Sequence, residues 1–146
     1  MTISAVSAGF ASYANTGSMT VRAPKPINVG DLLVVVMGSY RATSGLSAGW
    51  TQLVASGSTG QYLRAAWRIA DGTSNDDLTY SFVTAGQAAA MMGVFRSTVG
   101  WDSGPITQYQ SNINGAHSTW SYALSGSLTG VTAGQLTAVI GGQSDN

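Results

Sequence analysis

The chain has no cysteine and no glutamate, and lysine occurs once among its 146 residues. Without cysteine, the protein can form neither disulfide bonds nor a metal site with thiolate ligands. Charged residues make up 8% of the chain, whereas about 25% is usual for a soluble domain. Glutamate and lysine are common on exposed helices, so their scarcity argues against amphipathic surface helices. We therefore expect a surface of uncharged polar residues, which offers little repulsion between neighbouring copies.

The charge balance and the lack of long apolar runs argue against further classes of protein. Six basic and six acidic residues give a net charge of zero, and no basic cluster is present, so nucleic-acid binding is not expected. The first residues, Met1 to Ala5, contain neither a basic region nor a long apolar core, so we predict no classical signal peptide. No apolar run approaches the roughly 20 residues of a membrane helix, and no membrane association is expected.

The longest apolar run, residues 32–37, lies between the turn pair Gly30-Asp31 and Gly38. It is rich in β-branched residues and lacks a helical period, so it predicts a strand over residues 32–40 that is buried on both faces. Residues 88–96 are alanine-rich at first, but the flanking glycines leave little room for a long helix, and we predict a second buried strand.

Alternation of apolar and polar residues predicts most of the remaining strands. It is most regular in residues 62–70, where it predicts that the odd-numbered side chains face the core while Arg64 and Arg68 face solvent or a partner. Residues 15–18 are predicted as a turn and residues 41–49 as a loop of small residues. Further strands are predicted at residues 3–10, 19–23, 50–54, 78–83, 106–113, 118–124 and 134–142.

These strands predict one all-β domain over residues 1–146, a jelly-roll-like antiparallel β-sandwich of roughly eight to ten strands. Residues 1–24 would form an N-terminal arm or edge strands. Residues 30–38 align without gaps with residues 134–142, which either marks two equivalent strands or reflects the shared composition of buried strands. The later copy either closes the sandwich or is completed by a neighbouring chain.

No residue pattern predicts catalysis. His117 is the only histidine, and neither Ser118 nor Ser121 lies in the Gly-x-Ser-x-Gly turn that presents a nucleophile. The only adjacent carboxylates, Asp76 and Asp77, would point to opposite faces of a strand and so would not flank one glycosidic bond. We therefore predict that the protein is not an enzyme.

The acidic segment 71–77 could in principle supply oxygen ligands to calcium through its Asp and Asn side chains. Its spacing differs from the EF-hand pattern, and Asp and Asn also favour turns through their own hydrogen bonds. We expect a turn, with no metal and no other cofactor.

Several aromatic residues lie where they could contact a ligand or partner. Trp50 and Trp67 fall at expected core positions. In contrast, exposed rings beside loops can stack on sugars or anchor an interface. The residues expected in such a glycan or protein contact are Tyr40, Trp101, Asp102 and Trp120.

Four motifs follow one another along the chain: Gly30-Asp31 with the apolar run after it, Gly49-Trp50-Thr51-Gln52-Leu53, residues 63–70, and Val94-Phe95-Arg96 before Gly100. This series resembles a widespread group of β-sandwich domains in bacteriophage structural proteins, which includes capsid decoration (cement), minor tail and tail-fibre-associated proteins. The resemblance covers roughly residues 25–142. Arg68 and Arg96 are expected to face out of the core and to hydrogen-bond acids or carbonyls.

The resemblance implies a non-enzymatic structural protein of the phage virion, made in the host cytoplasm. Because the domain has no repeats and no coiled-coil shaft, we favour a capsid decoration protein that binds the shell as a homo-oligomer, with a trimer as the first expectation. The expected partner is the major capsid protein or a tail protein. The alternative is a tail or tail-fibre-associated carbohydrate-binding module for host adsorption.

Overall fold

The structure is a computed structural model and describes residues 3–58, 60–101 and 105–106. This part of the chain contains strands and one 3-10 helix, η1 (Ser74–Asp76), and all strand pairs are antiparallel. The prediction of an all-β antiparallel fold is therefore confirmed. The strands are β1 (Ile3–Val21), β2 (Leu32–Ser39), β3 (Thr43–Leu46), β4 (Thr51–Ser58), β5 (Gln61–Ile69) and β6 (Leu78–Ser97).

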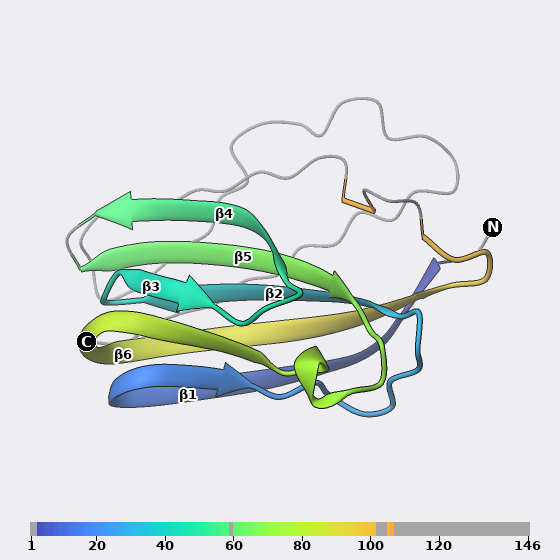
Figure 1. Ribbon diagram of the computed structural model, residues 1–146, viewed down its shortest axis with the longest axis horizontal. Coiled ribbons are helices and arrows are strands. Elements are labelled where there is room, and N and C mark those ends of the chain that lie inside the picture. The colour runs from blue at the N-terminus through green and yellow to red at the C-terminus, as the bar shows by residue number, and fades with distance from the viewer. Residues whose placement is uncertain (1–2, 59, 102–104, 107–146) are drawn as a thin grey trace.

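One sheet joins these strands in the order β1-β6-β2-β5-β4, and β3 pairs with β6 outside this path (Figure 1). Strand β2 lies between β5 and β6, and its side chains are buried or half-buried along its whole length, as the apolar run predicted. The turn before it also forms as predicted: Gly30 has a φ of 91°, and the Asp31 N–H donates to the Asn28 carbonyl over 3.1 Å.

Strands β1 and β6 bend together, so that each contributes two limbs to the sheet. Residues 3–13 of β1 pair with the second limb of β6, residues 88–97, whereas residues 18–21 pair with the first limb, residues 78–81. Register shifts lie between these two paired segments, and both strands curve back at the same end in Figure 1. The turn predicted at residues 15–18 is thus a bend within one long strand, not a break between two strands.

The two limbs bury one hydrophobic core. Met19, Leu78 and Tyr80 from the first limbs belong to the same buried cluster as Leu33 of β2 and Met92 of β6. This packing of one part of the sheet against another is consistent with a β-sandwich. Burying each large apolar side chain stabilises the fold by about 1.5–3 kcal/mol.

The two faces of β5 are buried differently from the prediction. Ala66 is fully buried in the main core, and Arg64 and Arg68 are buried beside it. The opposite face, with Leu63 and Ala65, packs with Val54 in a smaller cluster. Because β5 is an interior strand that is covered on both faces, its alternation separates two buried surfaces instead of core from solvent. Of the two predicted core tryptophans, Trp50 is buried and Trp67 is half-buried.

Residues 41–49 contain a strand that the sequence did not predict. Strand β3 pairs Thr43 with Phe82 and Leu46 with Tyr80, on the first limb of β6. Strand β3 consists mostly of small residues, so it lacks the apolar alternation from which a strand is predicted. The strand predicted at residues 88–96 is confirmed as the second limb of β6. The strands predicted at residues 106–113, 118–124 and 134–142, and hence the second copy of the internal match, lie outside the described residues.

Tyr80 provides a test of this core. Its side chain is fully buried, and within the described part of the chain its hydroxyl has no hydrogen-bond partner. An unpaired buried hydroxyl costs about 1–3 kcal/mol, so Tyr80→Phe should raise the free energy of unfolding by about 1 kcal/mol. Urea unfolding at neutral pH checks this. A loss of more than about 1 kcal/mol would mean that the hydroxyl is hydrogen-bonded in the folded protein.

Candidate functional site

The first charged pair ties the start of β2 to the end of β6. Arg96 donates from Nε and Nη2 to the two carboxylate oxygens of Asp31, each over 2.7 Å, and the Asn28 N–H donates to Oδ2 over the same distance. The Asp31 side chain is only 2% exposed. The hydrogen bonds from Arg96 hold the pKa of Asp31 below its ordinary value of 3.8, although burial opposes this shift.

This lowered pKa predicts a dependence of stability on pH. Above the unfolded pKa of Asp31 its carboxylate is ionised in both states, and the pair contributes fully. As pH falls toward the folded pKa, the unfolded chain takes up the proton first, so the free energy of unfolding should decrease steadily below about pH 5. Urea unfolding between pH 7 and pH 2.5 measures it, and Asp31→Asn should flatten the slope. An unchanged slope in that variant would contradict the assignment.

A second charged cluster organises the turn between β5 and β6. Asp76 accepts hydrogen bonds from Arg68 Nε over 3.1 Å, from the Asp71 N–H over 3.1 Å and from the Gly72 N–H over 2.9 Å. Arg68 also pairs with Asp71, whose pKa is lowered chiefly by hydrogen bonds from Thr73. The predicted turn is therefore confirmed. The prediction that Arg68 faces out of the core is wrong, since Arg68 is buried together with its partner Asp76.

All four carboxylates of the described residues are bound into the fold in this way. Besides the three above, Asp77 accepts from the Ala23 N–H over 2.8 Å and so joins the turn to the segment after β1. In residues 3–58, 60–101 and 105–106, no group of three or more histidine or acidic side chains could hold a metal ion. The same residues contain no helix that is long and apolar enough to cross a membrane.

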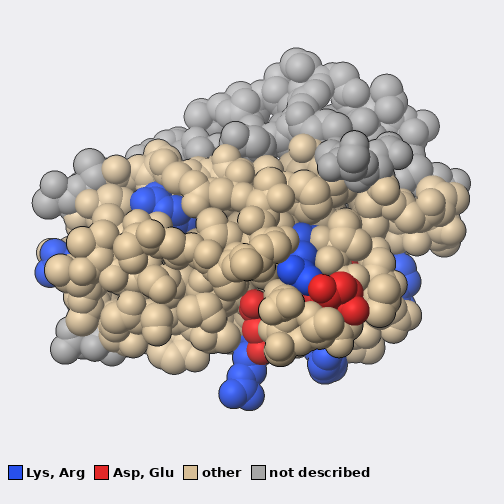
Figure 2. All heavy atoms as spheres, viewed as in Figure 1, with Lys and Arg blue, Asp and Glu red and all other residues tan. Residues whose placement is uncertain are grey.

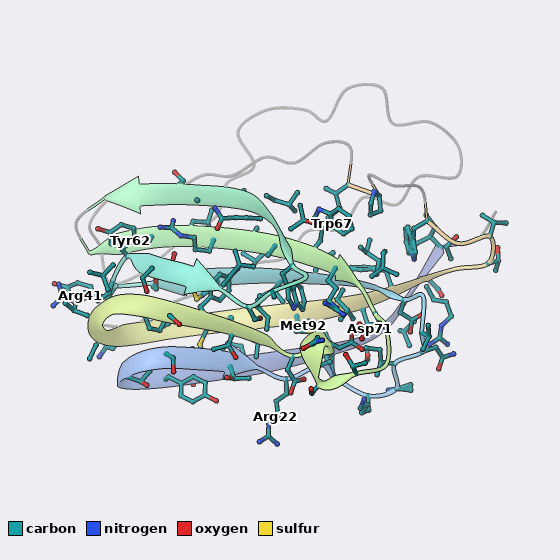
Figure 3. All side chains as sticks on the ribbon, in the orientation of Figure 1. Arg22, Arg41, Tyr62, Trp67, Asp71 and Met92 are labelled. Atoms are coloured by element: carbon teal, nitrogen blue, oxygen red, sulfur yellow. The ribbon has the colours of Figure 1, made fainter. Side chains whose placement is uncertain are left out.

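The opposite end of the sheet carries two tyrosines and two arginines, which we call the tyrosine–arginine end (Tyr40, Arg41, Tyr62 and Arg64). Ser39 pairs with Tyr62, so the rings of Tyr40 and Tyr62 belong to neighbouring strand ends. The Arg41 guanidinium lies 4.7 Å from the centre of the Tyr40 ring, and that of Arg64 lies 5.5 Å from the centre of the Tyr62 ring. Figure 3 shows Arg41 and Tyr62 together, far from Asp71.

Arg64 differs from the other buried arginine in its partners. Its Nε donates to Thr43 Oγ1 over 2.7 Å, and Nη1 donates to the carbonyls of Ser56 and Leu63, each over 2.9 Å. No described carboxylate pairs with it. Burial lowers the pKa of Arg64, but an arginine remains protonated in proteins. This end therefore has positive charge beside aromatic rings, a combination suited to an anionic or sugar ligand.

The structure separates two of the residues predicted to share a contact surface. Tyr40 follows the end of β2, whereas Trp101 follows β6 beyond the start of β2. The length of β2 places these two strand ends about 25 Å apart. Trp101 is half-buried, and its indole N–H is buried without a partner among the described residues. Asp102, Trp120 and His117 lie outside the described residues.

Sequence reasoning did not assign Arg41, Tyr62 or Arg64 to a site with Tyr40. The alternation in β5 placed Tyr62 and Arg64 on one face, but only the pairing of β5 with β2 brings that face to Tyr40. Figure 2 shows that the visible face is mostly free of charge, with acidic atoms gathered beside basic ones. Searches with the chain against protein-family models, curated proteins and solved structures found no match.

Proposed function

We propose that the protein is a non-enzymatic structural component of a bacteriophage virion that decorates the capsid. The observation that carries this proposal is that the described acidic side chains are all bound within the fold. The carboxylates of the described residues, Asp31, Asp71, Asp76 and Asp77, all accept hydrogen bonds that hold the fold together. None of them is left free to act as an acid or base, and the remaining surface is largely uncharged. The resemblance of the sequence motifs to phage β-sandwich domains is the reason for proposing a virion role.

Attachment to a shell would depend on shape and on many repeated weak contacts. A single uncharged surface contributes little binding free energy, but symmetry multiplies it when several copies engage neighbouring shell subunits. A neutral domain also avoids repulsion between closely spaced copies. The partner that fits this chemistry is a major capsid protein with a similarly uncharged outer face.

Copy number on the particle tests the proposal. Tagged protein should co-sediment with intact particles through a density gradient, and quantitative mass spectrometry should find hundreds of copies per particle, on the order of the shell subunits. A few copies to a few dozen would contradict decoration and assign the protein to the tail. Absence from purified particles would contradict a virion role altogether.

A second candidate function is carbohydrate binding, and the tyrosine–arginine end favours it. Tyr40 and Arg41 are exposed, and the Arg41 guanidinium supplies positive charge that would suit an acidic sugar. A glycan array should then show binding to acidic glycans that is lost in Tyr40→Ala and retained in a control, Tyr13→Ala, at an exposed tyrosine of β1. Binding that survives Tyr40→Ala would contradict this candidate.

A further inference from the structure

Strand β1 is the outermost strand on one side of the sheet. It is 19 residues long, and among the described residues it pairs only with β6. The backbone N–H and C=O groups on the other side of an outer strand can pair with another strand. In Figure 1, β1 and β4 lie at opposite borders of the sheet. No strand of the described residues pairs with this edge of β1, so the edge is a candidate surface for strand addition.

The common protections of an edge strand are missing from residues 7–13 of β1. Natural proteins block such edges with charged residues, prolines or bulges. From Ile3 to Val21 the strand has no charged residue and no proline. Its irregularities lie between Ala5 and Ser7 and after Tyr13, which leaves residues 7–13 as an uninterrupted edge. The other outer strand, β4, is only eight residues long and has a register shift near its start, so β1 offers the longer continuous edge.

Exposed aromatic side chains lie on the same segment. Phe10 is 65% exposed and Tyr13 is 43% exposed, although large apolar side chains are normally buried. Ala8, Phe10 and Ser12 are all exposed and, at alternate positions, share one face of the strand. In a strand pair, side chains on that face would meet those of the added strand.

We propose that two copies of the protein join through residues 7–13 of β1, which pair antiparallel about a two-fold axis and extend the sheet across both copies. An uncharged segment is complementary to itself, because no like charges meet when it pairs with its own copy. A partner strand with charged residues would set them against an edge that offers no counter-charge. A two-fold axis near the middle of the segment places Phe10 beside its copy, where two aromatic rings stabilise the pair.

This inference adds to the proposed function the surface through which two copies join. Its biological role rests on that proposed function. The two-fold pair is a dimer and not the trimer expected from the sequence. One short strand pair buries less surface than a standard interface, so the dimer should dissociate in the micromolar range. Sedimentation velocity over about 1 to 200 µM should therefore show a concentration-dependent shift from monomer to dimer.

Substitutions at Phe10 test the location of the contact. Phe10→Lys should weaken dimerisation at least tenfold, because two lysines would face each other across the axis. Phe10→Glu should do the same, and a mixture of the two variants should dimerise again. The matched control is Val29→Lys, which changes another exposed apolar residue, in the turn before β2. Circular dichroism and thermal unfolding establish that each variant is folded.

The lack of cysteine allows a second, independent measurement. A single cysteine at Phe10, beside the axis, should form a disulfide-linked dimer under mild oxidation, because a disulfide requires Cα atoms within about 7 Å. Single cysteines at Ala8 and Ser12 should link much more slowly, because each would lie about 14 Å from its own copy. Val29→Cys should link at least tenfold more slowly. Equal linking rates at all four positions, or a wild-type protein that stays monomeric at about 200 µM, would overturn the inference.

Both assays use purified protein without particles. Their failure would therefore remove the β1 contact while leaving the decoration proposal to the copy-number measurement. Conversely, a protein that dimerises through β1 but is absent from particles would retain this inference and lose the proposed virion role.

Discussion

Asp76→Ala should lower the free energy of unfolding by about 3–5 kcal/mol, the largest loss expected from a single side chain in the charged clusters. Asp76 is only 4% exposed and accepts hydrogen bonds from Arg68 and from the N–H groups of Asp71 and Gly72. With alanine at position 76, the buried Arg68 guanidinium would keep only one partner, the exposed Asp71 carboxylate. The backbone N–H groups of Asp71 and Gly72 would lose their acceptors. Removing one member of a buried pair costs more than the pair itself contributes, because the other charge remains buried.

Urea unfolding followed by circular dichroism measures this loss. The matched control is Asp71→Ala, which removes a carboxylate that also pairs with Arg68 but whose side chain is 47% exposed. Exposed ion pairs contribute little, so its effect should be several-fold smaller than that of Asp76→Ala. Equal effects of the two substitutions would show that Asp76 does not organise the turn.

The sequence predicted those parts of the fold that depend on local pattern. The run at residues 32–37, the alternation at 62–70 and the glycine-flanked segment at 88–96 each gave a strand at the right place. The sequence predicted separate strands at residues 3–10 and 19–23, and local pattern could not show that they form one strand, β1. Their joining depends on the pairing of β1 with both limbs of β6, whose residues lie about 60 to 90 positions away.

The orientation of β5 shows a second limit of local pattern. Alternation shows which residues share a face, but it cannot show whether the other face is solvated. Arg64 and Arg68 were therefore assigned to a face toward solvent or a partner, although both are buried and hydrogen-bonded within the chain. The buried position of Arg68 depends on Asp76, a turn residue that the sequence placed correctly but could not connect to β5.

The candidate contact residues illustrate the same point. Tyr40 and Trp101 were grouped because both are aromatic residues beside loops, but strand direction places them at opposite ends of β2. The hydrogen bonds of Arg68 and Arg96 to acids were predicted correctly, whereas the partner of Arg96, Asp31, lies 65 positions away and could only be identified in the fold. Asp31, Arg64, Arg68 and Asp76 are thus buried within the described part of the fold, whereas Arg22, Lys25 and Arg41 remain exposed.

Gly49→Ala should also be strongly destabilising, by about 3–4 kcal/mol in total. Gly49 has a φ of 82°, a conformation that costs an alanine about 1–2 kcal/mol. In addition, its new Cβ would overlap Nη1 of Arg68. A flexible arginine on the surface could move aside, but Arg68 is held by Asp76 and Asp71 and cannot move without loss of those contacts. The substitution therefore strains the backbone and displaces the cluster together.

Gly30→Ala separates these two effects, because Gly30 has a similar φ of 91° but has no atom within 4 Å of the added Cβ. It should show the backbone cost alone, about 1–2 kcal/mol. Urea unfolding of both variants gives the difference, which we expect to be about 2 kcal/mol. If Gly49→Ala is no more destabilising than Gly30→Ala, Arg68 can leave its position freely, and the charged cluster of Arg68, Asp71 and Asp76 is not what makes glycine necessary before Trp50.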